Sequence, residues 1–349
     1  MQHGWNATAY QIINPGMTLW FSAAGDAVIG FVPYRRVRVV AGAPVCSRER
    51  LREVAAEFED EAARAGFRVC YFGAEARVEA LHKDSPRHSL VLLGAQPTWH
   101  PRDWPKTLAN HASLRAQLNR AHNKGVSVDE WPAAEVADHA ELRRCLKEWL
   151  ATRGLPPLHF LIEPETLSHL SDRKLFVARQ AGEVVGFLVA SPVPQRHGWL
   201  VEQIVRGRRA PNGTAELLID AAVRAMASDG FEFVTMGLAP LSRRAKGVRD
   251  NNPRWLRFVL GRVRDHGRRF YNFEGLDNFK AKFQPERWDP VYAIVNEPRF
   301  SLSMLYAIAG AFGRTSPLAL VARAIFRGVA TEARWLWNGG LPEAKSVIR

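Results

Sequence analysis

The sequence predicts a mixed α/β protein built from two similar units in tandem. Short runs rich in β-branched and aromatic residues alternate with longer runs whose apolar residues recur every three or four positions, and this alternation starts again near residue 127. The chain has 349 residues, enough for two domains that each bury a core. We expect one unit over 1–128, a second over 129–299 and a helical tail over 300–349.

The first unit begins with an antiparallel meander. Between Thr18 and Pro44, short strand-like runs are separated by Gly, Asp and Pro. A helix is expected next over 47–65, with Ser47 as its N-cap and Gly66 directly after its end. Residues 67–72 then form another strand.

The segment 105–125 contains no acidic residue. As a single helix it would align three polar side chains at four-residue spacing, place two further cations one step around and turn three leucines inward: His111, Arg115 and Asn119; Arg120 and Lys124; Leu108, Leu114 and Leu118. Such a face suits phosphate groups. A solvated basic helix has the same pattern, so both interpretations stay open.

The second unit repeats the order of strands, helix and strand. A helix is expected over 137–153, and strands over 174–179 and 184–191 pair across Gly182. They are followed by a strand over 197–205, a loop over 206–213, a helix over 214–228 and a strand over 231–236. This order resembles that of GNAT-type acyltransferases, so we expect two GNAT-like units in tandem.

The loop 206–213 bears on the acyl donor. In ordinary GNAT acetyltransferases a glycine-containing loop opens the following helix, and its backbone amides hold the pyrophosphate of coenzyme A. Here Pro211 has no amide hydrogen and Gly213 stands late in the loop, so this phosphate cradle is incomplete. Coenzyme A is therefore the weaker candidate donor, and the loop's arginines suit an RNA or lipid phosphate equally well.

Charge and composition restrict the partners. The chain has 48 Lys and Arg against 35 Asp and Glu, a net charge of +13, which favours nucleic acid or an anionic membrane surface. Its three cysteines are widely spaced, which indicates reduced thiols in a cytosolic setting and no disulfide framework or structural zinc site. The eleven histidines form no metal-binding motif, so we expect no metal and no cofactor.

Neither a signal peptide nor a membrane-spanning segment is expected. The N-terminus has no basic region followed by an apolar core, and no run of 18 apolar residues occurs.

The stretch 270–283 places polar groups within an aromatic frame. Phe270, Phe273, Leu276, Phe279 and Phe283 recur at intervals of three and four, and five polar side chains sit among them: Asn272, Glu274, Asn278, Lys280 and Lys282. Charges held near apolar surface interact more strongly than in bulk water, which predicts a site. The alternative is an amphipathic helix with core aromatics and solvated lysines.

The run from Arg262 to Tyr292, which includes this stretch, Pro285 and Trp288, resembles the C-terminal signature of bacterial phosphatidylglycerol aminoacyltransferases. These are the lysyl- and alanyl-phosphatidylglycerol synthases of the multiple peptide resistance factor family. Residues 113–126 and 236–242 also resemble this family, and 113–126 resembles the Fem peptidyltransferases more distantly.

One position departs from the family pattern. Where the lipid aminoacyltransferases have Asp-x-x-Arg, this chain keeps Arg206 but has Gln203 at the acidic position. Glu202 is adjacent, and alternation along a strand predicts that it faces the opposite side. The difference puts in doubt a direct transfer of the acidic role.

The resemblance implies a cytoplasmic catalytic module, peripheral on the inner face of the cell membrane, that moves an amino acid from aminoacyl-tRNA to phosphatidylglycerol. Lys280 or Lys282 with Arg206 would stabilise the oxyanion and a phosphate, and Glu274 would bind the amino group or move a proton. Substrate contacts are expected from Glu202, Gln203, Asn272, Asn278, Arg115, Asn119, Arg120, Lys124, Arg243 and Arg244.

Two other functions stay open: an N-acyltransferase dependent on acyl-coenzyme A, and a tRNA- or membrane-binding module without activity. The many transmembrane helices that precede this module in full-length family members are absent, so either the chain would be an excised or a free-standing catalytic part, or its membrane contact would come from the tail. The amino acid, the acceptor and the oligomeric state are not fixed by motif spacing.

Two basic regions remain. Residues 243–269 carry many arginines with Trp255 and Phe258 among them, a pattern that fits a tRNA acceptor end or a membrane surface. The tail 300–337 predicts two short helices, apolar on one side and basic on the other, which suit anionic lipid or a packed helix pair.

Overall fold

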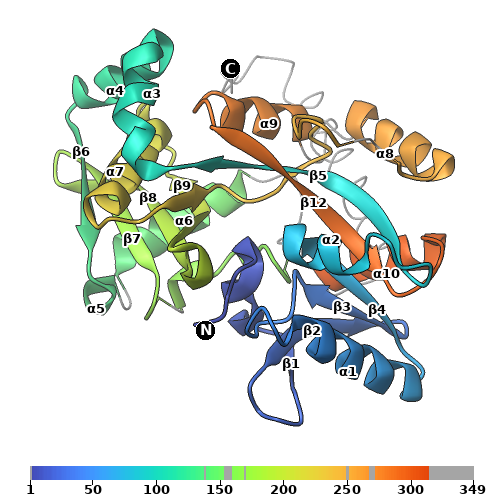
Figure 1. Ribbon diagram of the computed structural model, residues 1–349. Helices are drawn as coiled ribbons and strands as arrows, with labels where there is room; N and C mark the ends of the chain where they lie inside the picture. Colours follow the sequence, from blue (N-terminus) through green and yellow to red (C-terminus); the bar gives the residue numbers. More distant parts are fainter. Residues whose placement is uncertain are drawn as a thin grey trace, which may run out of the picture.

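The computed structural model describes residues 2–136, 139–152, 159–168, 170–248, 251–266 and 272–313. These residues form one large mixed sheet flanked by helices, which confirms the predicted α/β class (Figure 1). The strands follow the order β1-β2-β3-β4-β12-β5-β10-β9-β8-β7-β6, and β11 pairs with β5.

The first half of the sheet contains the predicted meander. Its elements are the 3₁₀ helix η1 (Ala7–Ile13), strands β1 (Thr18–Phe21), β2 (Val28–Tyr34), β3 (Val37–Ala41) and β4 (Arg68–Ala74), and helices α1 (Leu51–Arg64) and α2 (Ala76–His82). β1, β2 and β3 pair antiparallel, whereas β3 and β4 are parallel because α1 crosses between them.

Two long strands lie in the middle of the sheet. They are β5 (Ser89–Trp99) and β12 (Arg287–Val295), which pair antiparallel, with β12 between β4 and β5. The C-terminal part of the chain therefore returns to the centre of the molecule, where β5 and β12 run between the two halves (Figure 1).

The second half repeats the order of the first. Its strands are β6 (Val126–Trp131), β7 (Lys174–Gln180), β8 (Glu183–Val193), β9 (Gly198–Arg206), β10 (Phe233–Thr235) and β11 (Ala239–Pro240). β9 and β10 are parallel around helix α7, as β3 and β4 are around α1. This agrees with the predicted tandem order, whereas the residue boundaries of the domains stay a prediction.

The helices of this half and the C-terminal helices complete the structure. They are α3 (Trp104–Asn110), α4 (Ala112–His122), α5 (Ala133–Val136), α6 (Ala140–Ala151), α7 (Thr214–Ser228), α8 (Arg254–His266), α9 (Phe273–Ala281) and α10 (Leu302–Gly313), with 3₁₀ turns η2 (Pro101–Asp103), η3 (Thr166–Ser168) and η4 (Pro194–Arg196). α7 has the bounds predicted for it.

Side chains alternate between two cores on the faces of the second half. Phe176 and Ala178 of β7 pack with helices α4 and α7, whereas Leu175 and Val177 pack with α6. In the first half, α1 and α2 cover one face, and η1 with α10 covers the other.

Three predicted helices differ in their bounds. α1 begins at Leu51 rather than after Ser47, because Val45 still bridges to Val28 and residues 48–50 form a turn. The predicted helix 105–125 is broken at His111, whose φ of −123° and ψ of 86° are not helical. The predicted helix 137–153 is α6 alone, which begins at Ala140.

The beginning of the tail is packed rather than interfacial. Met304, Ala307, Ile308 and Ala311 of α10 are buried in the core of the first half, so this helix follows the packed alternative. The second predicted tail helix lies outside the described residues. Within the described residues, no helix has the length and apolar character needed to cross a membrane.

Candidate functional site

Helix α9 carries most of the predicted site. Asn272 is its N-cap, since its side-chain oxygen accepts a 2.8 Å hydrogen bond from the amide of Gly275. Phe283 is fully buried just beyond the helix and Phe279 packs against it, so these aromatics are core. Phe270 and Tyr271 lie outside the described residues.

Lys280 is buried, and its ammonium is enclosed by backbone. Nζ donates hydrogen bonds to the carbonyl oxygens of Met236, Gly237 and Leu238 at 2.7, 2.9 and 2.8 Å. Burial lowers the pKa of Lys280 to about 7, and the nearby carboxylate of Asp277 acts in the opposite direction. Three donors meet three acceptors, so Lys280 holds the segment leaving β10 in place.

Lys282 connects α9 to the start of α7. Its Nζ forms an ion pair with Glu216, a buried carboxylate in the first turn of α7, and lies 5.3 Å from the ring centre of Phe279. Glu216 also compensates the positive end of the α7 dipole. Lys282 is therefore a half-buried cation held between two helices.

A β-bulge changes the expected orientation of Glu202 and Gln203. The pairing of β8 with β9 shifts between Val189 and Ala190, which leaves Glu202 as an extra residue in β9. Both side chains consequently reach the segment 164–173, so the prediction that Glu202 faces the opposite side from Gln203 is wrong.

The two side chains have separate partners there. Glu202 forms a buried ion pair with Arg173 at 3.0 Å and accepts from Ser191, whereas Gln203 accepts from Thr166 and donates to the carbonyl of Pro164. A neutral amide at position 203 thus satisfies one hydroxyl donor and one carbonyl acceptor.

Arg206 ends β9 where the loop to α7 begins. One Nη donates to the carbonyl of Ala210 at 3.3 Å, but the Nε–H group is buried and has no hydrogen-bond partner among the described residues. An unpaired buried donor is costly, at roughly 1–3 kcal/mol, which marks Arg206 as a group that a ligand could satisfy.

The amino terminus of α7 is covered by α4. Gly213 has a φ of 99°, and a Cβ on it would lie 2.2 Å from the carbonyl oxygen of Gln117. α4 therefore lies directly against Gly213, and the first turn of α7 carries the Glu216 carboxylate that pairs with Lys282.

The remaining predicted residues surround these helices. Arg244 pairs with Asp277 at 2.7 Å and donates to the side-chain oxygen of Asn278 at 3.1 Å, whereas Arg243 and Glu274 are exposed. The exposed acid Glu274 lies in the first turn of α9, where it suits the helix dipole.

Helix α4 keeps a basic surface, although its parts differ in role. Arg115 turns back and donates to the carbonyls of Leu108 and Ala109 at the end of α3, next to the break at His111. Asn119, Arg120 and Lys124 are exposed. Lys124 also lines a cavity of about 630 Å³ together with Arg144, Glu148, Glu183 and Arg209.

The predicted site residues therefore do not form one cluster, and each of the three main side chains has its own contact. Lys280 engages the 236–238 carbonyls, Lys282 engages Glu216, and Arg206 engages Ala210. α9, α7 and the end of β9 are the elements that carry them.

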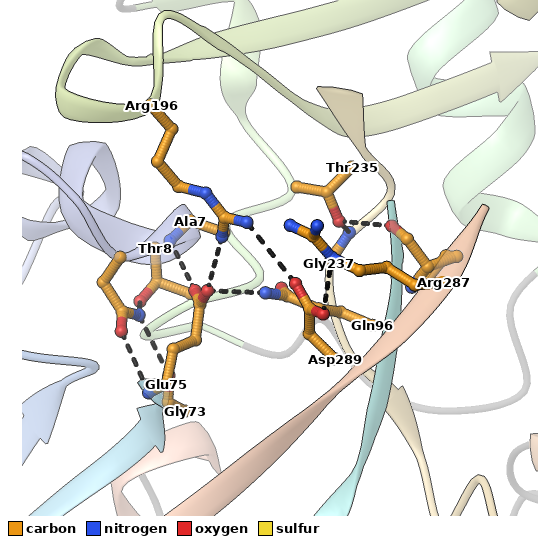
Figure 2. A network of polar contacts seen from close by, with 12 residues as sticks. Ala7, Thr8, Gly73, Glu75, Gln96, Arg196, Thr235, Gly237, Arg287 and Asp289 are labelled. Atoms are coloured by element: carbon orange, nitrogen blue, oxygen red, sulfur yellow. Dashed lines mark hydrogen bonds and ion pairs between the residues drawn. The ribbon is translucent and has the colours of Figure 1, made fainter. Parts of the chain in front are cut away.

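A buried network in the middle of the sheet was not predicted (Figure 2). Arg196 pairs with Glu75 at 2.9 Å and Asp289 at 3.4 Å, and Glu75 also accepts from Gln96 and from the amide of Ala7. Burial raises the pKa of Glu75, and Arg196 opposes that shift. These residues are far apart in sequence, so no motif could have revealed them.

A family model described as "Phosphatidylglycerol lysyltransferase, C-terminal" matches residues 1–295. A phosphatidylglycerol lysyltransferase of Bacillus subtilis is 26% identical over 319 residues, which cover 90% of this chain and 36% of the relative. The chain thus spans about a third of that relative's length.

Two solved structures have the same fold. The C-terminal domain of a protein named as a lysylphosphatidylglycerol synthetase in Agrobacterium fabrum gives a TM-score of 0.73 at 22% identity, covering 88% of this chain and 92% of that one. L-PGS from Bacillus licheniformis gives 0.72 at 22% identity, with coverages of 90% and 94%.

Proposed function

The chain belongs to the family of phosphatidylglycerol lysyltransferase C-terminal domains, and we propose that it transfers an amino acid from aminoacyl-tRNA to a hydroxyl group of phosphatidylglycerol. The transferred amino acid belongs to the lysine or alanine class. The basic surface of α4 and the net charge of +13 support a polyanionic donor.

The reaction is an exchange of esters. The lipid hydroxyl oxygen attacks the carbonyl carbon of the aminoacyl ester, a new C–O bond to the lipid forms, and the C–O bond to the tRNA ribose breaks. The hydroxyl proton ends on the ribose oxygen that leaves, and Glu274 is the proposed carrier. Because the ester is already activated, the protein supplies alignment and stabilisation of the oxyanion.

The observation that carries the site assignment is the unpaired Nε–H of Arg206. We assign this donor to the developing oxyanion or to a substrate phosphate, and Lys282 is the second cation of the proposed site, where a substrate anion would compete with Glu216 for its ammonium. We propose for Lys280 a positioning role in place of the oxyanion role that the resemblance implied, because all three of its hydrogens are given to the carbonyls of the 236–238 segment.

Coenzyme A is disfavoured as the donor by the start of α7. A pyrophosphate at Gly213 would compete with Lys282 for the region of the Glu216 carboxylate, and the contact between Gly213 and Gln117 fills the space beside Gly213. A ligand bound at Gly213 would require α4 to move away from α7, whereas the cavity lined by Gly207 and Arg209 lies at the other end of the loop.

Helix α8 is the proposed membrane-facing surface. Leu256 on its inner side is 1% exposed and Trp255 stacks on Phe300, whereas Phe258 is 64% exposed. Exposed arginines flank this ring, and the guanidinium of Arg262 lies 5.2 Å from its centre. An exposed aromatic among cations on an amphipathic helix suits an anionic lipid surface.

The transfer reaction is tested with purified protein, tRNA charged with labelled amino acids, and liposomes containing phosphatidylglycerol. We expect label in the organic phase, and Arg206→Ala lowers the rate at least tenfold while Arg64→Ala, an exposed arginine on α1, leaves it unchanged. Label that never enters lipid, with acetyl-coenzyme A bound tightly in calorimetry, would favour the acyl-coenzyme A alternative.

The membrane surface is tested by sedimentation with the same liposomes. Phe258→Ser should weaken binding severalfold, whereas Phe21→Ser should not, although Phe21 on β1 is equally exposed at 61%. If Phe258→Ser instead weakens tRNA binding and spares the liposomes, α8 is an RNA surface.

A further inference from the structure

Two imidazoles and one carboxylate meet in the first half of the molecule, away from the elements that carry Arg206 and Lys280. Glu59 comes from α1, His82 ends α2, and His88 directly precedes β5. One ligand atom from each lies within 4.8 Å of the other two. The side chains are only 15%, 8% and 6% exposed, respectively.

Both imidazoles direct Nε2 toward the same carboxylate. Nε2 of His88 lies 3.1 Å from one oxygen of Glu59, and Nε2 of His82 lies 3.9 Å from the other. The Nε2 atom of His82 is buried and has no hydrogen-bond partner among the described residues. A buried nitrogen that is unpaired and faces a carboxylate is the arrangement that a bound cation would satisfy.

Two neighbouring hydroxyl groups hold these ligands in place. Ser85 Oγ lies 2.8 Å from Nδ1 of His88, and Tyr71 donates to Glu59 at 3.0 Å. When Nδ1–H of His88 donates to Ser85, the Nε2 lone pair is free to bind a metal. Outer hydrogen bonds of this kind commonly orient imidazole and carboxylate ligands.

We propose that Glu59, His82 and His88 form a binding site for a divalent transition metal of the Zn²⁺ class. Two imidazole nitrogens and one carboxylate oxygen are ligands that Zn²⁺ accepts, and a water molecule completes a tetrahedron. The metal would tie α1 to the end of α2 and the start of β5, so its effect is on the stability of this half.

Metal binding requires one local change. The rings of His82 and His88 are stacked, with centres 3.9 Å apart and planes at 27°. Two imidazoles that share a metal must converge on it, so the ring of His82 turns about its Cβ–Cγ bond on binding. The free protein keeps the stack, and the metal opens it.

The sequence alone does not predict this metal site because the three ligands follow no known motif. His82 and His88 are six positions apart, and Glu59 lies on the preceding helix. Only the packing of α1 against β4 and α2 brings the three together.

The test uses the full chain without a histidine tag. Protein is incubated with excess Zn²⁺, passed over a desalting column and analysed for metal by mass spectrometry, and its melting temperature is compared with and without a chelator. We expect one Zn²⁺ per chain and a melting temperature several degrees higher with the metal.

Variants separate this site from adventitious binding. His82→Ala and Glu59→Gln should abolish both effects, whereas His122→Ala, which removes an exposed histidine on α4, should change neither. Circular dichroism checks that each variant is folded, and the visible absorption of bound Co²⁺ gives a second readout in wild-type protein. Absence of retained metal in folded wild-type protein, or equal metal in His82→Ala, would overturn the proposal.

Discussion

Lys280 is a buried lysine whose hydrogen-bond partners are backbone carbonyl oxygens. Its three hydrogens are given to the carbonyls of Met236, Gly237 and Leu238, in a segment that turns between β10 and β11. The turn includes Gly237 with a φ of 66°, so these carbonyls are not paired as in a regular strand. The lysine replaces the missing partners.

We therefore predict that Lys280→Met destabilises the protein by about 3 kcal/mol at pH 6. The substitution leaves three carbonyls without donors, and relief from burying an ammonium offsets only part of that cost. Urea denaturation followed by tryptophan fluorescence measures the difference. Lys246→Met, which removes an exposed lysine, is the control and should have little effect.

The lowered pKa of Lys280 also predicts a pH dependence. Burial sets this pKa to about 7 in the folded state, against 10.5 for an exposed lysine. Between these values the unfolded chain holds a proton that the folded chain has released, so this group makes stability rise with pH. The unfolding free energy of wild-type protein minus that of Lys280→Met should grow from pH 7 to 9, by up to about 1.4 kcal/mol per unit. A difference that stays flat or shrinks would contradict the assignment.

At the scale of elements, helix α4 packs closely against the amino terminus of α7 at Gly213. Gly213 permits it because its φ of 99° and the nearby carbonyl of Gln117 exclude a side chain. This contact supports our proposal that the donor is not coenzyme A, although the order of strands and helices is GNAT-like.

Gly213→Ala should accordingly lower stability by more than 2 kcal/mol, because a Cβ adds a backbone clash to the strain of a positive φ. The matched control is Gly230→Ala, since Gly230 has a φ of 81° but no atom within 4 Å of its Cβ position. The Gly230→Ala variant should lower the free energy of unfolding by only about 1 kcal/mol. Thermal and urea unfolding compare the two, and equal losses would show that the α4 contact is loose.

At the scale of the whole molecule, the buried network around Arg196 joins both halves. Arg196 precedes β9, Glu75 follows β4, and Asp289 lies in β12 (Figure 2). The guanidinium also lies 3.5 Å from the ring centre of Phe233 in β10. Residues from both halves of the molecule therefore contact the Arg196 side chain. Because this contact is shared, we expect the two halves to unfold together as one unit.

Removing Arg196 should be among the costliest single changes outside the apolar core. Arg196→Met leaves Glu75 buried without its cation, and we expect a loss of about 3–5 kcal/mol. Adding Glu75→Gln should recover part of this loss, since the orphaned carboxylate is then gone. Calorimetry also tests the coupling: two separate transitions in wild-type protein would show that the network does not join the halves.

The sequence by itself determined the α/β class, the bounds of α7, the paired strands β7 and β8, and the resemblance that leads to the family. These features depend on local periodicity, turn residues and motif spacing, which are written in consecutive residues. Only the tertiary structure decided the orientation of Glu202 beside Gln203, the carbonyl partners of Lys280 and the contact of α4 with Gly213 at the start of α7. It also decided the ion pair of Glu75 with Arg196 and the proximity of Glu59 to two histidines. Each of these depends on the register of a strand or on contact between distant segments, and neither is fixed by neighbours along the chain.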